Sequence, residues 1–384
     1  MVKFKDICTK IGSGATPKGG KEAYCEEGIS LIRSQNVLDF AFSAEGLAFI
    51  NDLQAEKLKN VIVEEGDVLL NITGDSVARA CMVDKQYLPA RVNQHVCIVR
   101  ANPQKAVPSY LLYFLQLNKE YLLQLAAGGA TRNALTKEMV NNLELELPSI
   151  EEQQKIAAIL DDIQARIDCN NAINENLAVL LQTVYQERFG DVDIAAKQGV
   201  LSDICSYSKD RVAVSELDVT TYFSTENMLP RKAGSTEATS LPTTPQTTAC
   251  HKGDTLISNI RPYFKKIVYC EDECGCSTDV LCFTPNQPQY SAYLFSTLYA
   301  DKFFAFMVAG AKGTKMPRGD KQQIMTYPIV LPSEVALVEF NTIALPMIKQ
   351  IYSNRAENKR LSLLRDTLLP KVMSGELDVS DIDL

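Results

Sequence analysis

The side chains best suited to catalysis are few and far apart. The chain has two histidines, His95 and His251, separated by about half of its length. Neither an H-E-x-x-H nor a G-x-S-x-G motif occurs, so the sequence indicates no zinc hydrolase and no serine nucleophile elbow. A methyltransferase would need a glycine-rich cofactor loop and a motif that handles the target base, and we find neither. We therefore expect the chain to be no enzyme by itself and to hold no cofactor.

A group of thiols is the candidate metal site. Cys270, Cys274 and Cys276 lie close in sequence, with Cys282 and His251 nearby, and these residue types are zinc ligands. However, the spacing C-x3-C-x-C is not a familiar structural zinc pattern. The chain has 11 cysteines without paired spacing and begins without the apolar core of a signal peptide. We predict reduced thiols, no metal and a cytoplasmic location, with zinc as the alternative.

The stretch IGSGATPKGGK, residues 11–21, looks like a phosphate-binding loop. That loop requires G-x-x-x-x-G-K-[ST]. Here Gly20 stands in place of the Lys, and Lys21 is followed by Glu22 and not by Ser or Thr. We interpret the stretch as a loop after a first strand, in which Thr16 and Lys18 are candidate binding residues. A phosphate-loop nucleotidase is the enzymatic alternative.

Composition places the chain among globular proteins with room for two domains. Of its 384 residues, 46% are hydrophobic and 22% are charged, and no run of eighteen apolar residues occurs, so we expect no membrane span. The net charge of −8 is unevenly distributed. Residues 150–190 carry seven acidic and three basic side chains, which is half of the excess. The two large blocks are nearly neutral, so each has charge available for a basic face.

Short segments of the first half recur in the same order in the second half. An ordered series of this kind predicts a duplicated unit with a pseudo-two-fold internal repeat. Within each unit we expect short strands, then a helix at 108–126 or 291–309, then a long helix. The recurring pairs include FKDIC (4–8) with LSDIC (201–205), GDVLLNI (66–72) with GDTLISNI (253–260), and 126–148 with 308–332.

Two long helices are expected to follow the two blocks. Residues 150–186 contain no Gly or Pro, and their apolar residues recur in alternating steps of four and three, as in a coiled-coil seam. Pro346 should kink the second helix or mark its first turn. Since Asn at a seam favours an Asn partner and fixes register, we predict an antiparallel coiled coil, with two separate surface helices as the alternative. The seam is interrupted at Asn170, Asn174, Asn354 and Asn358.

Loops that combine basic, small polar and aromatic residues are the candidate DNA contacts. Lys and Arg supply charge for phosphates, while Arg and Asn pair with base edges. In the first block the candidates are Thr16, Lys18, Arg33, Asn36, Asn71, Thr73, Arg79, Thr131, Arg132, Asn133 and Lys137. In the second block they are Asn259, Arg261, Tyr263, Lys265, Lys266, Thr314, Lys315, Arg318 and Lys321.

With these motifs in place, the sequence resembles the DNA-specificity subunits of type I restriction-modification systems, over essentially its whole length. The resemblance is carried by GSGATPKGG with GISLIRSQNV, by GDVLLNITG, and most specifically by GGATRNALTKEMVNNLELELPSIEEQQKIAAILDDI. The C-terminal LRDTLLPKVMSGEL is also typical of them. The second half departs from the pattern, because LPSEVALVEFNTI lacks the EEQQKIA helix start.

The resemblance implies an α+β fold with two tandem α/β target recognition domains, 1–149 and 191–333, and two spacer helices, 150–190 and 334–384. Each domain would read one half of a split site in double-stranded DNA, and the helices would set the gap. Two modification subunits would methylate adenine with S-adenosylmethionine. Restriction subunits would cut with ATP and Mg. A coiled-coil scaffold that never touches DNA is the alternative, although it leaves the matched basic loops unexplained.

Overall fold

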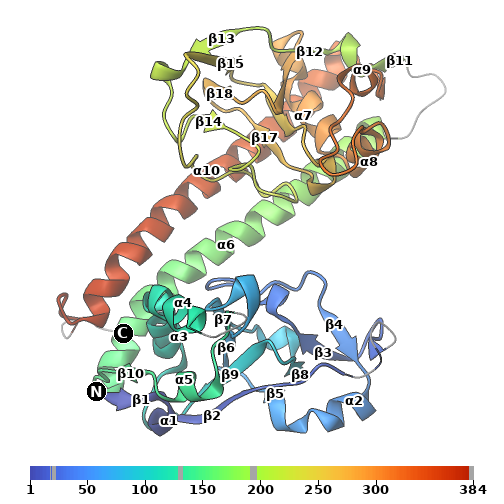
Figure 1. Ribbon diagram of the computed structural model, residues 1–384. Coiled ribbons are helices and arrows are strands. Elements are labelled where there is room, and N and C mark those ends of the chain that lie inside the picture. Colours follow the sequence, from blue (N-terminus) through green and yellow to red (C-terminus); the bar gives the residue numbers. More distant parts are fainter. Residues whose placement is uncertain (18, 20–22, 129–132, 191–196, 380–384) are drawn as a thin grey trace. The chain divides into compact units, whose positions relative to one another are not determined.

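The computed structural model describes residues 1–17, 19, 23–128, 133–190 and 197–379 (Figure 1). The chain forms two compact units. Unit 1 comprises Met1–Asp168 and Asn358–Leu384, and unit 2 comprises Cys169–Glu357. The division falls inside both long helices, α6 (Ile150–Phe189) and α10 (Glu334–Met373), so each unit contains a segment of both. This differs from the predicted boundaries at 149, 190 and 333, which treat the helices as separate parts.

Unit 1 contains two four-stranded sheets and a short strand pair. One sheet has the order β2-β9-β6-β7 and is antiparallel, the other has the order β4-β3-β8-β5 with β3 parallel to β8, and β1 pairs with β10. The strands are β1 (Val2–Lys3), β2 (Cys8–Ser13), β3 (Ile29–Ile32), β4 (Ala48–Ile50), β5 (Ile62–Val63), β6 (Val68–Asn71), β7 (Ala80–Met82), β8 (Ala90–Val92), β9 (Val96–Ala101) and β10 (Glu144–Leu145). The shorter helices are α1 (Phe4–Ile7), α2 (Asp52–Lys57), α3 (Pro108–Leu117), α4 (Lys119–Ala127) and α5 (Lys137–Asn141).

Unit 2 repeats this plan. Its sheets have the orders β12-β19-β16-β17 and β13-β15-β18-β14, with β14 parallel to β18, and β11 pairs with β20. The strands are β11 (Gln198–Val200), β12 (Cys205–Tyr207), β13 (Arg211–Ala213), β14 (Tyr222–Phe223), β15 (Gln246–Cys250), β16 (Thr255–Ser258), β17 (Ile267–Tyr269), β18 (Cys274–Cys276), β19 (Val280–Pro285) and β20 (Pro328–Val330). The shorter helices are α7 (Ser291–Tyr299), α8 (Asp301–Ala309) and α9 (Lys321–Met325).

The two units differ at both edges of the second sheet. The strands β3, β8 and β5 correspond to β14, β18 and β15, because β3 and β14 are the parallel neighbours and β5 and β15 the antiparallel ones. In unit 1 the fourth strand, β4, adds to β3. In unit 2 the fourth strand, β13, adds to β15 instead. The predicted duplication is therefore present in the topology, with a different outer strand in each copy.

The central strand of the first sheet separates two hydrophobic cores in each unit. In unit 1, Val68 and Leu70 of β6 pack in one cluster while Leu69 packs in the other. In unit 2, Ile257 and Leu256 of β16 divide in the same way. Because side chains alternate across a strand, a strand buried on both faces needs apolar residues at consecutive positions. This explains the runs VLL and TLI that follow each Gly-Asp pair.

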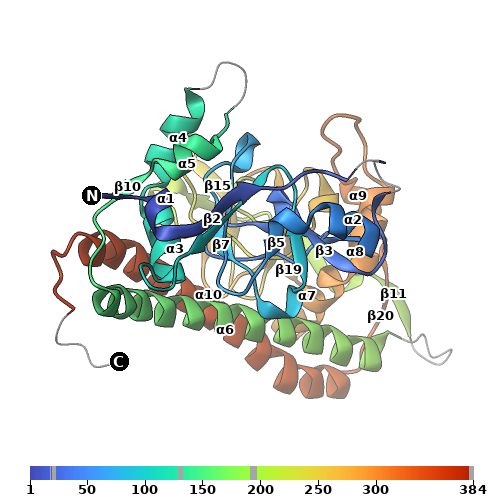
Figure 2. The same ribbon diagram turned by 90° about the horizontal axis from the view of Figure 1, so that it is seen from below.

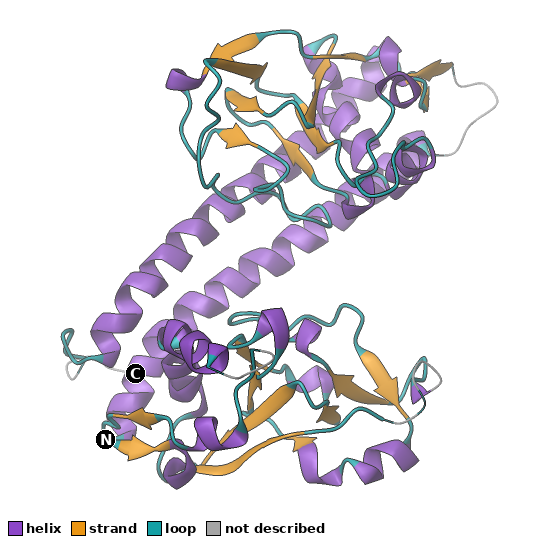
Figure 3. Ribbon diagram, in the orientation of Figure 1, coloured by secondary structure: helices purple, strands orange, loops and turns teal. Residues whose placement is uncertain are grey.

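A helix lies between the first sheet and α6 in each unit (Figure 3). In unit 1 the Tyr113 hydroxyl on α3 donates to Asp161 on α6 at 2.8 Å. In unit 2 the Tyr185 hydroxyl on α6 bonds Thr297 on α7 at 2.9 Å. The predicted single helices at 108–126 and 291–309 are wrong in one respect, since each is two helices. The breaks occur at Asn118, whose amide donates to the Phe114 carbonyl, and at Ala300, whose backbone is extended.

The long helices run antiparallel and side by side within each unit (Figures 1 and 2). In unit 1 the Arg365 guanidinium donates to the Gln164 side chain at 2.7 Å. In unit 2 the Arg188 guanidinium donates to Glu339 at 3.1 Å. The predicted role of Pro346 as a first-turn residue is wrong, because α10 begins at Glu334 and continues through Pro346.

The seam Asn residues lie where these helices face each other. In unit 2 the Asn354 amide donates to the Asn174 side-chain oxygen at 2.9 Å, and both residues are buried. The Asn170 amide donates to Glu357 at 3.0 Å. In unit 1 the half-buried Asn358 donates to the Ile167 carbonyl at 3.4 Å. One matched pair of amides and two other polar pairs therefore stand in the seam.

A buried glutamine connects the start of α6 to the segment before α3 through hydrogen bonds. Gln153 is completely buried, and its side chain makes three hydrogen bonds. It accepts from the Val107 backbone N–H at 3.0 Å and donates to the carbonyls of Lys105 and Pro148 at 3.1 and 2.9 Å. These groups precede α3 and α6, so one side chain holds both helix starts together. This gives a physical role to the Gln of the EEQQKIA motif.

We expect Gln153→Ala to lower the free energy of unfolding of unit 1 by about 3 kcal/mol, because it removes three partly buried hydrogen bonds to backbone groups. Urea unfolding followed by hydrogen exchange of α3 would measure this. Gln154→Ala is the matched control, because Gln154 is exposed and is expected to change stability little. Equal stability of the two variants would contradict the role of Gln153.

The tight turn before the central strand has the same backbone-to-Asp hydrogen bond in both units, but the charged residues around it differ. In unit 1, Asp67 accepts from the Glu64 N–H at 2.8 Å and from Arg100 at 2.7 Å. In unit 2, Asp254 accepts from the His251 N–H at 2.8 Å, and His251 takes the place of Glu64. The His251 ring lies 2.6 Å from Glu273 and 3.0 Å from Asp210. Glu273 first and Asp210 second raise the pKa of His251 above its usual 6.5.

Because the folded-state pKa of His251 is raised, its contribution to stability is complete below pH 6.5 and is lost as pH rises through the folded-state value. We therefore expect wild type to lose more stability than His251→Gln between about pH 5.5 and about pH 8.5. The effect should be small, since the His251 side chain is 43% exposed. Urea midpoints at both pH values would measure it. A difference between the two proteins that is independent of pH would contradict this prediction.

Candidate nucleic-acid interface

The loop after the central strand has the same backbone course in both units. We call residues Thr73–Arg79 the unit 1 loop and Ile260–Lys266 the unit 2 loop. The Gly74 N–H donates to the Asn133 carbonyl at 3.2 Å, and the Arg261 N–H donates to the Pro317 carbonyl at 2.8 Å. Each loop is thereby attached to the segment that precedes α5 or α9. The two attachments make Gly74 and Arg261 equivalent positions.

Two left-handed residues shape each loop. In unit 1 they are Gly74 (φ 77°) and Ala78 (φ 68°), and in unit 2 they are Arg261 (φ 50°) and Lys265 (φ 52°). A side-chain-bearing residue costs about 1–2 kcal/mol in this conformation. Unit 2 thus tolerates backbone strain at two cationic residues. Strain of this kind is retained where the surrounding structure enforces it, and it often occurs at functional sites.

The unit 1 loop borders an open cleft of about 400 Å³. Most of its lining side chains are polar, and the described lining residues include no Phe or Tyr. Along one wall, Thr73 Oγ1 lies 2.5 Å from His95 Nδ1, and the Gln94 amide lies 3.1 Å from His95 Nε2. Thr16 hydrogen-bonds Gln94 and extends this chain. The lining residues are Ser34, Gln35, Thr73, Gly74, Asp75, Ser76, Arg79 and His95.

The glycine-rich stretch after β2 has a packing role next to this cleft. A Cβ on Gly14 would lie 1.7 Å from the Val92 carbonyl oxygen, so no other residue fits there without a shift of the backbone. The Gly14 N–H donates to the Asn93 carbonyl at 3.0 Å, two residues before His95. The stretch therefore brings Thr16 to the Gln94–His95 pair. Lys18 lies outside the described residues.

Of the other unit 1 candidates, some are buried and some exposed. Asn36 is buried, accepts from the Arg33 N–H at 3.0 Å and donates to the Ser43 carbonyl. Asn71 is buried and donates to the Ser34 carbonyl at 2.9 Å. Arg33 bonds the Gly46 carbonyl and lies over the Tyr24 ring at 5.6 Å. Asn133 and Lys137 are exposed, and Thr131 and Arg132 lie outside the described residues.

Several residues of the cleft lining, Gln35 and His95 among them, are not among the candidates that the sequence predicts. The two histidines form no catalytic motif in the sequence, so residue type alone does not place His95 at a binding surface. The signal that was available is its place in VNQHVCIVRA, directly before a strand that follows a turn. Gln35 lies beside Asn36, and consecutive residues in a short helical turn point in different directions. The buried Asn36 therefore leaves its neighbour exposed at the rim.

The unit 2 loop presents aromatic and cationic side chains. Tyr263 is 49% exposed and Phe264 39% exposed, and their ring centroids lie 4.8 Å apart. Lys265 donates to Asp301 at 2.9 Å. Lys266 is half-buried, burial lowers its pKa, and it donates to the Thr225 carbonyl. Asn259 is buried at the start of the loop.

A second basic loop lies beside it. Lys312 and Arg318 close this loop by exchanging backbone hydrogen bonds of 2.8 and 2.9 Å, and Arg318 also bridges to Ile260. The Arg318 guanidinium donates to Asp279 at 3.0 Å, where unit 1 has the Thr73–His95 pair. Thr314 and Lys315 are exposed at the loop tip. Lys321 begins α9 and lies 5.9 Å from the Tyr207 ring.

Five thiols lie together in one hydrophobic core of unit 2, namely Cys250, Cys270, Cys274, Cys276 and Cys282. The eleven cysteines are free, and Cys270 and Cys274 place their sulfurs 3.6 Å apart. Within the ranges that the structure describes, no group of three or more His, Cys, Asp or Glu side chains is arranged to hold a metal ion. Within the same ranges, no helix is long and apolar enough to cross a membrane.

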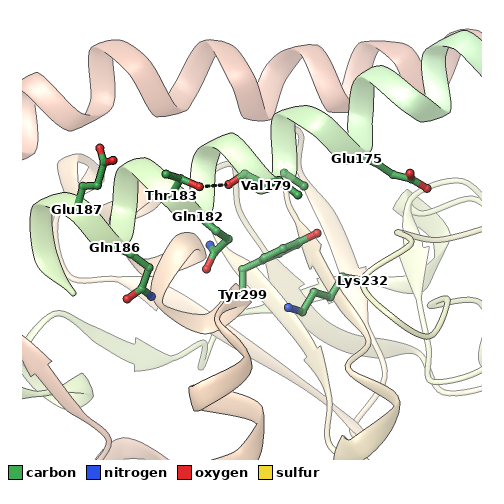
Figure 4. A pocket seen from close by; sticks show the side chains of 9 residues that line it. Glu175, Val179, Gln182, Thr183, Gln186, Glu187, Lys232 and Tyr299 are labelled. Atoms are coloured by element: carbon green, nitrogen blue, oxygen red, sulfur yellow. Dashed lines mark hydrogen bonds between the residues drawn. The ribbon is translucent and has the colours of Figure 1, made fainter. Parts of the chain in front are cut away.

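A larger, mostly apolar groove of about 720 Å³ follows α6 in unit 2 (Figure 4). Val179, Gln182 and Thr183 of α6 line it, and Lys232 and Tyr299 lie opposite them. The Lys232 ammonium lies 4.5 Å from the Tyr299 ring centroid and 2.7 Å from Asp301. The groove therefore combines a helix face with one paired cation.

Comparison with known proteins agrees with this architecture. Residues 1–178 match the family described as type I restriction modification DNA specificity domain. The HindI specificity subunit of Haemophilus influenzae is 26% identical over 192 residues, which cover 49% of this chain and 41% of that protein. The MjaIX specificity subunit of Methanocaldococcus jannaschii is 23% identical over 99% of this chain and 94% of its own length.

A solved structure shares the fold across both units. The type I restriction-modification S subunit from M. genitalium has a TM-score of 0.62 at 15% identity, covering 97% of this chain and 95% of that one. None of these relatives supports the scaffold alternative. Residues 1–178 thus match a type I restriction modification DNA specificity domain, and the chain as a whole is similar in sequence to type I restriction enzyme specificity subunits.

Proposed function

We propose that this chain reads a split site in double-stranded DNA, one half-site with each unit, and directs adenine methylation and restriction by partner subunits. The observation that carries the proposal is the pair of equivalent loops, which have one backbone course and different side chains. A duplicated scaffold with divergent loops suits a protein that reads two different half-sites. The chemistry would belong to the partners, namely two modification subunits with S-adenosylmethionine and restriction subunits with ATP and Mg.

In unit 1 we assign base reading to the rim of the polar cleft. Gln35 and Arg79 carry the side-chain types that pair bidentately with adenine and guanine. Thr16 and Lys137 are suited to the phosphate backbone. The side-chain amides of Asn36 and Asn71 donate hydrogen bonds to backbone carbonyls. We therefore propose that these residues hold the loops in place and do not contact bases.

In unit 2 we assign phosphate and base contacts to the two basic loops. Thr314 and Lys315 are exposed at one tip, and Arg261 and Tyr263 belong to the other loop. Arg318 is the candidate for base reading, because its guanidinium pairs with Asp279, the residue at the position that His95 holds in unit 1. The Arg318 side chain is 55% exposed although it pairs with Asp279, so some of its N–H donors remain available to DNA.

Exposed apolar residues on the long helices support docking of the modification subunits. In unit 2, Val179 is 67% exposed on α6 beside the groove of Figure 4, and Val335 and Val338 are exposed on α10. In unit 1, Leu363 is 70% exposed on α10. A coiled-coil pair that leaves apolar residues uncovered on its outer faces suits further helices packing against it. We propose a helical segment of a modification subunit as the occupant.

Substitutions at one unit should alter one half-site only. We expect Gln35→Ala with Arg79→Ala to relax the bases accepted in the half-site of unit 1, and Arg318→Ala to relax those of unit 2, each by about 1–3 kcal/mol of discrimination. Single-molecule methylome sequencing of cells that express the chain with its modification subunit would map both half-sites. Lys59→Ala, an exposed basic residue outside the cleft lining, is the control. Absence of any methylated split site with wild type would refute the proposed function.

The long helices should set the gap between the half-sites. Removing seven residues from each helix at facing positions shortens them by about 10 Å. At about 3.4 Å per base pair, the gap should shrink by about three base pairs while both half-sites stay the same. The same methylome measurement tests this, with seven-residue Ala replacement of equal length as the control. Altered half-site bases with an unchanged gap would rule out the spacer role.

A further inference from the structure

The unit 2 loop carries a feature that the unit 1 loop lacks at the equivalent positions. Counting from the shared left-handed residue, Tyr263 corresponds to Ser76 and Phe264 to Val77. Val77 is buried, whereas Phe264 is exposed. One backbone course therefore ends in a recessed polar surface in unit 1 and in two projecting rings in unit 2.

The projecting rings are held rigidly. Pro262 is buried, and it begins the short 3-10 helix Pro262–Phe264. The Phe264 N–H donates to the Arg261 carbonyl at 2.9 Å, and the Phe264 carbonyl accepts from the Arg231 N–H at 2.7 Å. A loop fixed on both sides loses little conformational entropy when it binds, so the rings are preorganised for contact.

Cationic groups flank the rings. Arg261 and Lys265 stand directly before and after Pro262–Phe264, and Lys315 lies at the tip of the adjoining loop. Met316, 50% exposed, adds a third apolar side chain from that loop. Apolar side chains bordered by Arg and Lys are the chemistry with which proteins enter a stacked base step while holding the phosphates on either side.

We propose that Tyr263 and Phe264 form a wedge that partly unstacks one base step in the half-site of unit 2, while unit 1 reads a step that stays stacked. This inference rests on the proposed function, since it needs DNA at this face. The partner is a flexible step in duplex DNA, and pyrimidine–purine steps are the ones most easily opened. Specificity at that step would come from deformability, without hydrogen bonds to the base edges.

The test uses the complete complex of this chain with its modification subunits and a duplex carrying both mapped half-sites. The fluorescent base analogue 2-aminopurine, which brightens when unstacked, replaces each adenine of one half-site in turn. We expect wild type to raise the fluorescence several-fold at one step of the unit 2 half-site. Tyr263→Ala with Phe264→Ala should abolish this rise and weaken binding about tenfold or more. No position of the unit 1 half-site should depend on these two residues.

Three further samples separate the outcomes. Tyr121→Ala, which removes an exposed aromatic from α4 of unit 1, should leave the signal unchanged. Tyr263→Phe should retain it, because stacking needs the ring and not the hydroxyl. A mismatch at the opened step should restore binding by the double Ala variant, which a misfolded variant would not permit. Normal methylation without any fluorescence rise overturns the wedge and leaves the proposed function intact, whereas absent methylation of every site overturns both.

Discussion

The candidate interface depends on one backbone hydrogen bond in each unit, from the residue three positions after the central strand to the segment that precedes α5 or α9. It joins Gly74 to Asn133 and Arg261 to Pro317. Because β6 and β16 are buried on both faces, the loops that leave them start from fixed points. The bond then determines where each loop turns back. Side chains on the loop are therefore free to vary while their positions remain constant, which is the condition for changing what a binding surface recognises without rebuilding its fold.

The duplication and the long helices could be predicted from sequence because they leave periodic or repeated patterns. The α6 seam repeats over 40 residues, and Asn174 and Asn354 occupy facing positions in it. The division of residues 108–126 into two helices could not be predicted, because the apolar pattern continues on both sides of Asn118, where the first helix ends. The first-turn role predicted for Pro346 is wrong, since helix α10 begins at Glu334 and continues through Pro346.

Residue type alone does not show which candidate residues can face DNA, because it does not determine their burial. Residue type identifies Asn36 and Asn71 as suited to base contacts. However, an Asn amide is equally suited to hydrogen-bonding the backbone of a turn, and both residues do this here. Conversely, Gln35 and His95 line the cleft because the short turns that carry them point their side chains toward it. The spacing of residues in the sequence does not determine that direction. The equivalence of Arg261 with Gly74 is visible only in the hydrogen bonds, because Arg carries no sequence signal for a left-handed backbone.

The different outer strands of the second sheets bear on how a chain with two similar halves folds reliably. Tandem homologous domains are prone to exchange elements during folding, because a strand of one copy can pair with the sheet of the other. Here β4 covers the β3 edge in unit 1, while β13 covers the β15 edge in unit 2. The strand equivalent to β3 is β14 in unit 2, the strand equivalent to β15 is β5 in unit 1, and each of these ends its described sheet. The asymmetry thus leaves a different strand at the open end of the sheet in each half, so the two halves offer different edges to a strand exchanged during folding.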